Sequence, residues 1–97
     1  MIDYSLGRGT LNGMGKYEKL IDQILRGASD TNIAFVDLVR LLRRLGFDER
    51  TRGSHRLFRM SGVEEKINLQ ADGSHAKPYQ VRQVRDVILK YRLGVDD

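Results

Sequence analysis

The residue types with the clearest potential for chemistry lie in the stretch Thr51–Arg59, which combines a glycine, two hydroxyl groups, an imidazole and three arginines within nine positions. Histidine is the side chain whose ordinary pKa lies near neutrality, so a histidine such as His55 can accept and donate protons in the cell. Arginines such as Arg52 and Arg56 supply the fixed positive charge that binds a phosphodiester. An imidazole beside guanidinium groups favours cleavage of RNA, with His55 as the catalytic group.

The same stretch has a plainer interpretation, because a histidine at the start of a strand is commonly a surface residue or a hydrogen-bonded core group. Gly53 can adopt a positive φ and so suits a tight turn before a strand. That turn would hold Ser54 and His55 rigidly while leaving them in contact with solvent. The residues that we expect to bind RNA around this turn are Arg40, Arg43, Arg52, Gly53, Ser54, Arg56 and Lys77.

The composition limits the classes of protein that the chain can belong to. A chain of 97 residues forms one small domain. The absence of cysteine excludes disulfides and thiolate metal sites and is typical of a reducing cytoplasm. Two histidines and scattered carboxylates lack the spacing of metal ligands, so we expect no metal and no cofactor. No apolar run reaches the length of a membrane span and no signal peptide is recognisable, which predicts a cytoplasmic protein without a membrane partner.

The formal net charge of +4 is unevenly distributed along the chain. Residues 34–60 contain seven arginines and three carboxylates, and residues 76–92 contain five cations and one carboxylate. Two basic segments of this kind indicate a face that binds a polyanion. The charge alone is equally compatible with an ordinary solvated surface.

Two short tails enclose the expected domain. Residues 1–15 contain four glycines and show neither helical nor strand periodicity, which predicts a flexible N-terminal tail and leaves Met14 open as the start of translation. The periodic pattern covers residues 16–93, which we expect to form a single domain. Residues 94–97 are the expected C-terminal tail.

Apolar residues recur at three- and four-residue spacing in three segments. They predict helices over Lys16–Arg26, Ala34–Leu45 and Tyr79–Arg92. Asn32 is the expected N-cap of the second helix, and Pro78 fits the first turn of the last one.

Between the second and third helices, the pattern predicts strands over Phe47–Arg52, Ser54–Met60 and Glu65–Gln70, with a hairpin turn at residues 61–64. In the second strand, alternation places His55 and Arg56 on opposite faces, and neither face is purely apolar. We therefore expect an antiparallel sheet that is covered by helices on one side only, an α+β arrangement. Alternation does not say which face His55 occupies.

Two segments of the chain resemble the signature of the HicA toxins. Residues 41–47 (LLRRLGF) end a helix in Gly-Phe, and residues 52–58 (RGSHRLF) carry a Gly-Ser-His turn that enters a strand. Residues 67–70 (INLQ) and 77–85 (KPYQVRQVR) are similar to one branch of that family. The resemblance covers about residues 32–93, and the distance between the two motifs makes it more specific than Gly-Ser-His alone.

The resemblance implies an α-β-β-β-α core like that of a double-stranded-RNA-binding domain, here with an extra N-terminal helix. It also implies a metal-independent endoribonuclease that cleaves mRNA as the toxin of a type II toxin–antitoxin system, and that a HicB-like antitoxin neutralises. His55 would be the catalytic residue, because it occupies the histidine of the motif, and Gly53 would form the turn that places it. The extra helix, Lys16–Arg26, either completes the core or contacts the antitoxin.

The chemistry expected of His55 needs a second group. RNA carries its own nucleophile, the 2′-hydroxyl, but one histidine cannot act as base and acid in the same step. Lys77, Tyr79 and His75 are candidates for the second role or for a phosphate contact, and each is also compatible with a simple surface position. A non-catalytic RNA-binding module and a protein-interaction domain with an acidic partner are the competing interpretations.

Overall fold

The computed structural model describes residues 15–94. Met14, the rest of the predicted N-terminal tail before Gly15, and residues 95–97 of the predicted C-terminal tail lie outside the described residues. The elements follow one another in the order α1 (Lys16–Arg26), the short 3₁₀ helix η3 (Asp30–Asn32), α2 (Phe35–Leu45), β1 (Asp48–Arg52), β2 (His55–Met60), β3 (Val63–Leu69), β4 (Ala71–Asp72), β5 (His75–Ala76) and α3 (Pro78–Tyr91).

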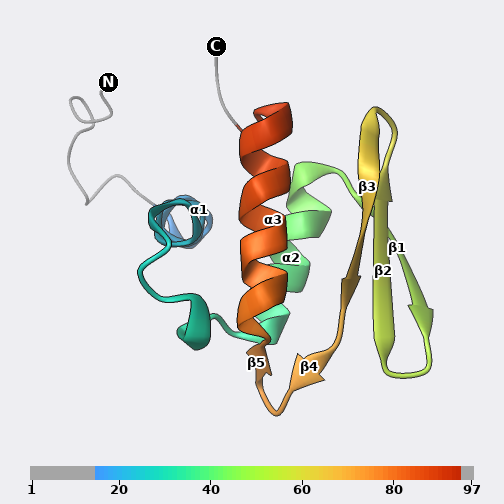
Figure 1. Cartoon of the computed structure of the whole chain (residues 1–97), viewed down its shortest axis with the longest axis horizontal. Coiled ribbons are helices and arrows are strands. Elements are labelled where there is room, and N and C mark those ends of the chain that lie inside the picture. The colour runs from blue at the N-terminus through green and yellow to red at the C-terminus, as the bar shows by residue number, and fades with distance from the viewer. Residues whose placement is uncertain (1–14, 95–97) are drawn as a thin grey trace.

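The three longer strands form an antiparallel sheet in the order β1-β2-β3, and the helices lie on one side of it (Figure 1). Phe58, Ile67 and Leu69 point from this sheet into the core and are fully buried. The residues that alternate with them, such as Leu57 and Asn68, therefore lie on the opposite face, which no described helix covers. The predicted α+β class and the one-sided sheet are confirmed.

The start of α2 differs from the prediction. Asn32 is the last residue of η3, and α2 begins at Phe35 with Ala34 in the N-cap position, so the prediction of Asn32 as the N-cap was wrong. The reason is tertiary: the backbone N–H of Phe35 donates to the carbonyl oxygen of Ser74 at 3.0 Å. A carbonyl from the hairpin β4–β5 thus satisfies one of the free N–H groups that a side-chain cap would otherwise take.

The turn between β2 and β3 is also shorter than predicted. Met60 pairs with Val63, so the loop contains only Ser61 and Gly62, and the predicted four-residue turn at 61–64 was wrong. Gly62 has a φ of 87°, which allows the tighter turn. The short hairpin β4–β5 and the 3₁₀ helix η3 are additional to the predicted elements. The other strand and helix ends lie within one residue of the prediction, apart from the start of β3.

The first helix completes the core. Ile24 of α1 is fully buried and belongs to the same hydrophobic cluster as the apolar residues of α2, α3 and the sheet. Arg85 of α3 fastens the linker after α1, because its guanidinium donates to both carboxylate oxygens of Asp30, at 2.9 and 3.2 Å, and to the carbonyl oxygen of Ile24 at 3.1 Å. The hydrogen bonds to Asp30 raise the pKa of Arg85.

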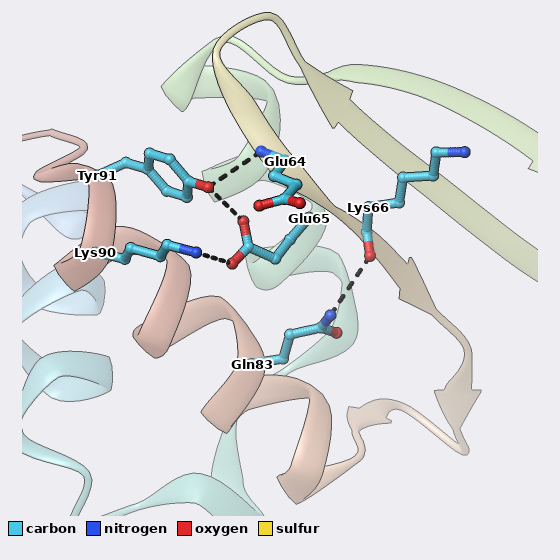
Figure 2. A network of polar contacts seen from close by, with 6 residues as sticks. All are labelled: Glu64, Glu65, Lys66, Gln83, Lys90 and Tyr91. Atoms are coloured by element: carbon cyan, nitrogen blue, oxygen red, sulfur yellow. Dashed lines mark hydrogen bonds and ion pairs between the residues drawn. The ribbon is translucent and has the colours of Figure 1, made fainter.

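The last turns of α3 are joined to β3 by a polar network that we call the β3–α3 seam (Figure 2). The hydroxyl of Tyr91 donates to Glu65 at 2.7 Å and accepts from the backbone N–H of Glu64 at 3.1 Å, and Lys90 pairs with Glu65 at 2.9 Å. The hydrogen bonds from Tyr91 and then from Lys90 lower the pKa of Glu65, and the hydrogen bond to Glu65 raises the pKa of Lys90. Further along, Gln83 donates to the carbonyl oxygen of Lys66 at 3.4 Å.

Candidate active site

The turn that carries the predicted motif is a two-residue loop. Arg52 and His55 are register partners at the end of β1 and the start of β2, so only Gly53 and Ser54 lie between them. Gly53 has a φ of 58°, and a glycine with positive φ in the first position of such a loop matches the right-handed twist of the two strands. The loop therefore places His55 as the first residue of a strand that is held on both sides.

His55 lies half-buried on the open face of the sheet and is oriented by a neighbour on β3. Its ring atom Nδ1 lies 3.0 Å from Oδ1 of Asn68. An amide oxygen only accepts hydrogen bonds, so in this orientation of the amide Nδ1 is the donor, and in the neutral imidazole Nε2 then keeps its lone pair. A neutral imidazole held in this way presents a proton acceptor to its surroundings.

A hollow of about 200 Å³ lies beside His55, between β3 and the N-terminal turns of α3. Tyr79, one of the candidates for the second acid–base role, lies on its wall with more than half of its surface exposed. Its polar walls and its opening to solvent suit a charged or hydrogen-bonding ligand. The residues that line the hollow are His55, Lys66, Asn68, Gln70, Tyr79, Gln80 and Gln83.

Gln70 connects two of the predicted RNA-binding residues at this site. Its side-chain amide donates to the hydroxyl of Ser54 at 3.1 Å and accepts from the ammonium group of Lys77 at 3.3 Å. Gln70 thus bridges Ser54 and Lys77, which are distant in sequence, and Gln70 itself lines the hollow beside His55. His75 is not among the residues that line the hollow, and its ring contacts the hydroxyl of Ser74 at 3.3 Å.

Gln70 is held in turn by Gln80, the buried polar residue of α3, which is only 2% exposed. In the orientation that satisfies both ends of its amide, Gln80 accepts from the backbone N–H of Gln70 at 3.2 Å and donates to the backbone carbonyl of Gln70 at 3.3 Å. This pair of bonds resembles one step of a β-ladder. It fixes the residue just after β3 to the start of α3, where the hollow lies.

The predicted arginines separate into two groups. Arg43 and Arg56 both pair with Glu49, and the hydrogen bond from Arg43, helped by Arg56, lowers the pKa of Glu49. Arg56 also lies over the ring of Phe35, 5.7 Å from its centroid. These groups border a second hollow of about 230 Å³, which we call the α2 hollow and which is lined by Phe35, Val36, Val39, Arg40, Arg43 and Arg56.

Because Arg56 alternates with His55 along β2, the α2 hollow lies on the helix-covered side of the sheet, whereas His55 is on the other face. The His55 hollow lies at the β3 edge of the sheet, where residues of α3 also line it. Arg52, in contrast, is the register partner of His55 and shares its face. Of the predicted RNA-binding residues, the structure thus places Arg52, Gly53, Ser54 and Lys77 around His55, and Arg40, Arg43 and Arg56 around the α2 hollow.

Asn68, Gln70 and Lys66 belong to the site although they were not predicted as site residues. The signal for them in the sequence is the alternation along β3 and the next position, where these three polar residues alternate with the buried Ile67 and Leu69. Their register against β2 is what brings Asn68 to His55, and a sequence pattern does not supply that register.

Two further properties of residues 15–94 bear on the site. They contain no group of three or more histidine, aspartate or glutamate side chains arranged to hold a metal ion. Within this same range, every helix is too short or too polar to cross a membrane.

A comparison of the chain with protein-family models, curated proteins and solved structures finds no match. The resemblance to the HicA toxins therefore stays a prediction that rests on the quoted motifs.

Proposed function

We propose that the protein is an endoribonuclease that cleaves single-stranded mRNA without a metal ion and uses His55 as its general base. The observation that carries this proposal is the hydrogen bond between His55 Nδ1 and Asn68 Oδ1, which leaves Nε2 free beside an open polar hollow. Here only Nδ1 has a hydrogen bond among the described residues.

The proposed reaction is a transesterification within the RNA. Nε2 of His55 removes the proton of a 2′-hydroxyl, and the 2′-oxygen attacks the adjacent phosphorus. The bond from phosphorus to the 5′-oxygen then breaks, and that oxygen takes up a proton. The products are a 2′,3′-cyclic phosphate and a 5′-hydroxyl. RNA supplies its own nucleophile, so no metal is needed to provide one, and general acid–base help from His55 is typically worth about 10²–10⁴-fold.

The other groups of the site have matching roles in this proposal. Arg52 shares the face of His55 and supplies positive charge for the phosphate. Lys77 and Ser54, held together by Gln70, contact a neighbouring phosphate or sugar. Tyr79, on the wall of the hollow, is the candidate that protonates the leaving oxygen.

The resemblance to the HicA toxins supports the same function and extends it to a biological role. In that role the protein is the toxin of a type II toxin–antitoxin system in the cytoplasm, and a HicB-like antitoxin neutralises it. A HicB-like protein encoded by a neighbouring reading frame is the simplest genetic support for this part of the proposal.

The test is a cleavage assay on single-stranded RNA with the purified protein and its His55→Gln variant, both in the presence of a metal chelator. We expect the native protein to leave 2′,3′-cyclic phosphate ends. We expect the variant to lose at least about a hundredfold of this activity, since glutamine does not exchange protons near neutrality. The variant should keep its thermal unfolding temperature and its RNA affinity, because His55 is only half-buried.

Three outcomes would overturn the proposal. A folded His55→Gln variant that cuts at the native rate would make His55 a positional residue. Ends with 3′-hydroxyl and 5′-phosphate groups would indicate hydrolysis instead of transesterification. A native protein that binds RNA but never cuts it would leave the alternative, a non-catalytic RNA-binding module.

A further inference from the structure

We propose that the open face of the three-stranded sheet is the track along which a single strand of RNA lies and reaches His55. This inference rests on the proposed function, because it assigns the substrate a path to the proposed catalytic residue. It concerns residues on β1, β2 and β3 that carry no role in the catalytic proposal, above all Arg50, Arg59 and Lys66.

The strand register arranges the open face in rows. Arg52 and His55 form the first row, with Gln70 beside them just past the end of β3. Arg50, Leu57 and Asn68 are register partners and form the second row. Asp48 and Arg59 are register partners and form the third row. Lys66 of β3 shares this face by alternation with Asn68, at the point where the register of β2 against β3 shifts. Figure 2 shows the Lys66 side chain pointing away from α3, in agreement with this placement.

The cations of these rows are available for a ligand. Arg50, Arg52, Arg59 and Lys66 are exposed, and none of them forms an ion pair among residues 15–94. The carboxylates that share the face, Asp48 and Glu64, are likewise without an ion pair there and leave the face with an excess of positive charge. In the α2 hollow, by contrast, Arg43 and Arg56 already pair with Glu49, so a phosphate would have to compete with that carboxylate.

The dimensions of the face fit one nucleic-acid strand. Two residues along a β-strand advance about 6.6–6.8 Å, so Arg59 lies roughly 13 Å along β2 from His55. Three strands at about 4.8 Å spacing make a face about 10 Å wide between the outer backbones. A row of cations over this length contacts successive phosphates of a single extended strand.

The chemistry of the face favours RNA over a protein partner. Leu57 is the single large apolar side chain that β1, β2 and β3 present on this face, and it is half-buried. A stable protein interface needs an apolar centre, which the face lacks. Apart from the imidazole of His55, β1, β2 and β3 present no aromatic ring on this face, so base stacking would contribute little. We therefore expect contacts to the phosphate backbone, and hence affinity that depends strongly on salt and little on sequence.

The experiment measures equilibrium binding of a fluorescent, 2′-O-methylated single-stranded RNA over a series of KCl concentrations. The modification blocks the 2′-hydroxyl, so binding is read without cleavage and independently of the role of His55. Three double variants, each removing two charges, are compared: Arg50→Gln with Arg59→Gln on the open face, Arg40→Gln with Arg43→Gln at the α2 hollow, and Lys19→Gln with Arg26→Gln on α1 as the control.

We expect the open-face variant to bind about tenfold more weakly, with a salt slope shallower by roughly 1.4, or about 0.7 for each of two phosphates. The control should stay within about twofold of the native affinity. A larger loss in the α2 variant than in the open-face variant, or an open-face variant that binds like the control, would overturn the proposal.

A second measurement covers the case in which the open-face variant does not fold. In the native protein, bound RNA should protect Lys66 from acetylation and leave Lys19 reactive. Equal reactivity of Lys66 with and without RNA would overturn the proposal. A failure of the catalytic proposal would be recognised separately, because it affects cleavage by His55→Gln and not these binding measurements.

Discussion

Both the β3–α3 seam and the surroundings of His55 join β3 to another element by polar side chains, but they use their charges differently. At the seam, Glu65 receives hydrogen bonds from Tyr91 and Lys90, and the pKa values of Glu65 and Lys90 move in the directions that favour their charged forms (Figure 2). Around His55, the contacts to Asn68 and through Gln70 involve neutral amide groups, and Arg52 forms no ion pair within residues 15–94.

This difference indicates a division of the sheet into a region that stabilises the fold and a region that can bind a ligand. A cation that already pairs with a carboxylate in the folded protein contributes to stability, and an incoming anion must compete with that carboxylate for it. A cation next to neutral amides keeps its charge for an incoming anion. The seam is therefore expected to respond to mutation in stability, and the end of the sheet near Gly53 in RNA binding and cleavage.

The sharpest test of this division replaces one hydrogen-bonding residue in each region. Asn68→Ala removes the group that fixes the proton on Nδ1 of His55, and we expect cleavage to fall by about ten- to a hundredfold because the ring loses its orientation. Unfolding temperature should hardly change, since Asn68 is exposed. The matched control, Tyr91→Phe at the seam, should lower the unfolding temperature and leave cleavage unchanged.

Asn68→Asp adds a change in the pH–rate profile, which a merely structural role of Asn68 would not produce. A carboxylate beside the imidazole favours its protonated form, so the acid side of the pH–rate profile should move to higher pH. An Asn68→Ala variant with native activity, or an Asn68→Asp variant with a native pH–rate profile, would remove Asn68 from the site.

The second prediction concerns the two hydrogen bonds by which Gln80 of α3 holds the backbone of Gln70 at the end of β3. Gln80→Leu keeps a similar size but leaves the backbone N–H and carbonyl of Gln70 without their partner, which we expect to cost about 1–3 kcal/mol in the free energy of unfolding. Denaturant unfolding measures this loss. The control is Gln83→Leu at the seam, where a single longer bond to a carbonyl is lost and the cost should be smaller. Equal losses of unfolding free energy in the two variants would show that Gln80 does not hold β3 to α3 more strongly than Gln83 does.

The third prediction uses the two hairpin turns at opposite ends of β2. Gly53 and Gly62 have φ values of 58° and 87°, and an added Cβ would meet no atom within 4 Å at either position. Gly53→Ala and Gly62→Ala should therefore each cost about 1 kcal/mol through backbone strain alone. Only Gly53→Ala should also reduce cleavage, because only that turn holds His55. Equal activities of the two variants would mean that the Gly53 turn does not place the catalytic group.

The smallest expected effect is the response of the seam to acid. The hydrogen bonds from Tyr91 and Lys90 hold the pKa of Glu65 below its ordinary value of 4.5, so the folded state favours the carboxylate. This contribution to stability is present above about pH 4.5 and is lost as the pH falls through the lowered pKa.

Thermal unfolding of the native protein and of Glu65→Gln over this pH range should therefore give curves that differ at neutral pH and converge in acid. Glu64→Gln, which removes the same charge one position earlier, is the control. A constant gap between native and Glu65→Gln proteins down to low pH would contradict the role given to Tyr91 and Lys90.

Local patterns in the sequence were sufficient for the three α-helices, the three longer strands and their order, but not for η3 or the β4–β5 hairpin. The apolar spacing of Lys16–Arg26 predicted α1 with its observed bounds, and the positive φ expected of Gly53 is present in the turn before β2. The α+β class and the one-sided sheet followed from the same patterns. These features depend on neighbours within a few positions, which is the information that periodicity and turn residues carry.

Contacts between distant segments decided the rest. The cap of α2 was mispredicted because Ser74, far along the chain, supplies the carbonyl oxygen. The face of His55 was left open because alternation groups residues by face without saying which face the helices cover. Once Phe58 packs against the helices, His55 must take the open side, and Arg56 must take the covered side with Glu49.

The tertiary structure decides which residues make up the site. Charge counts predicted a basic surface, but they did not distinguish arginines that Glu49 neutralises from those on the open face. The pairing of His55 with Asn68 depends on the register of β2 against β3, which changes between Phe58 and Met60. Register is set by the packing of a whole face against the core, so no local stretch of sequence determines it.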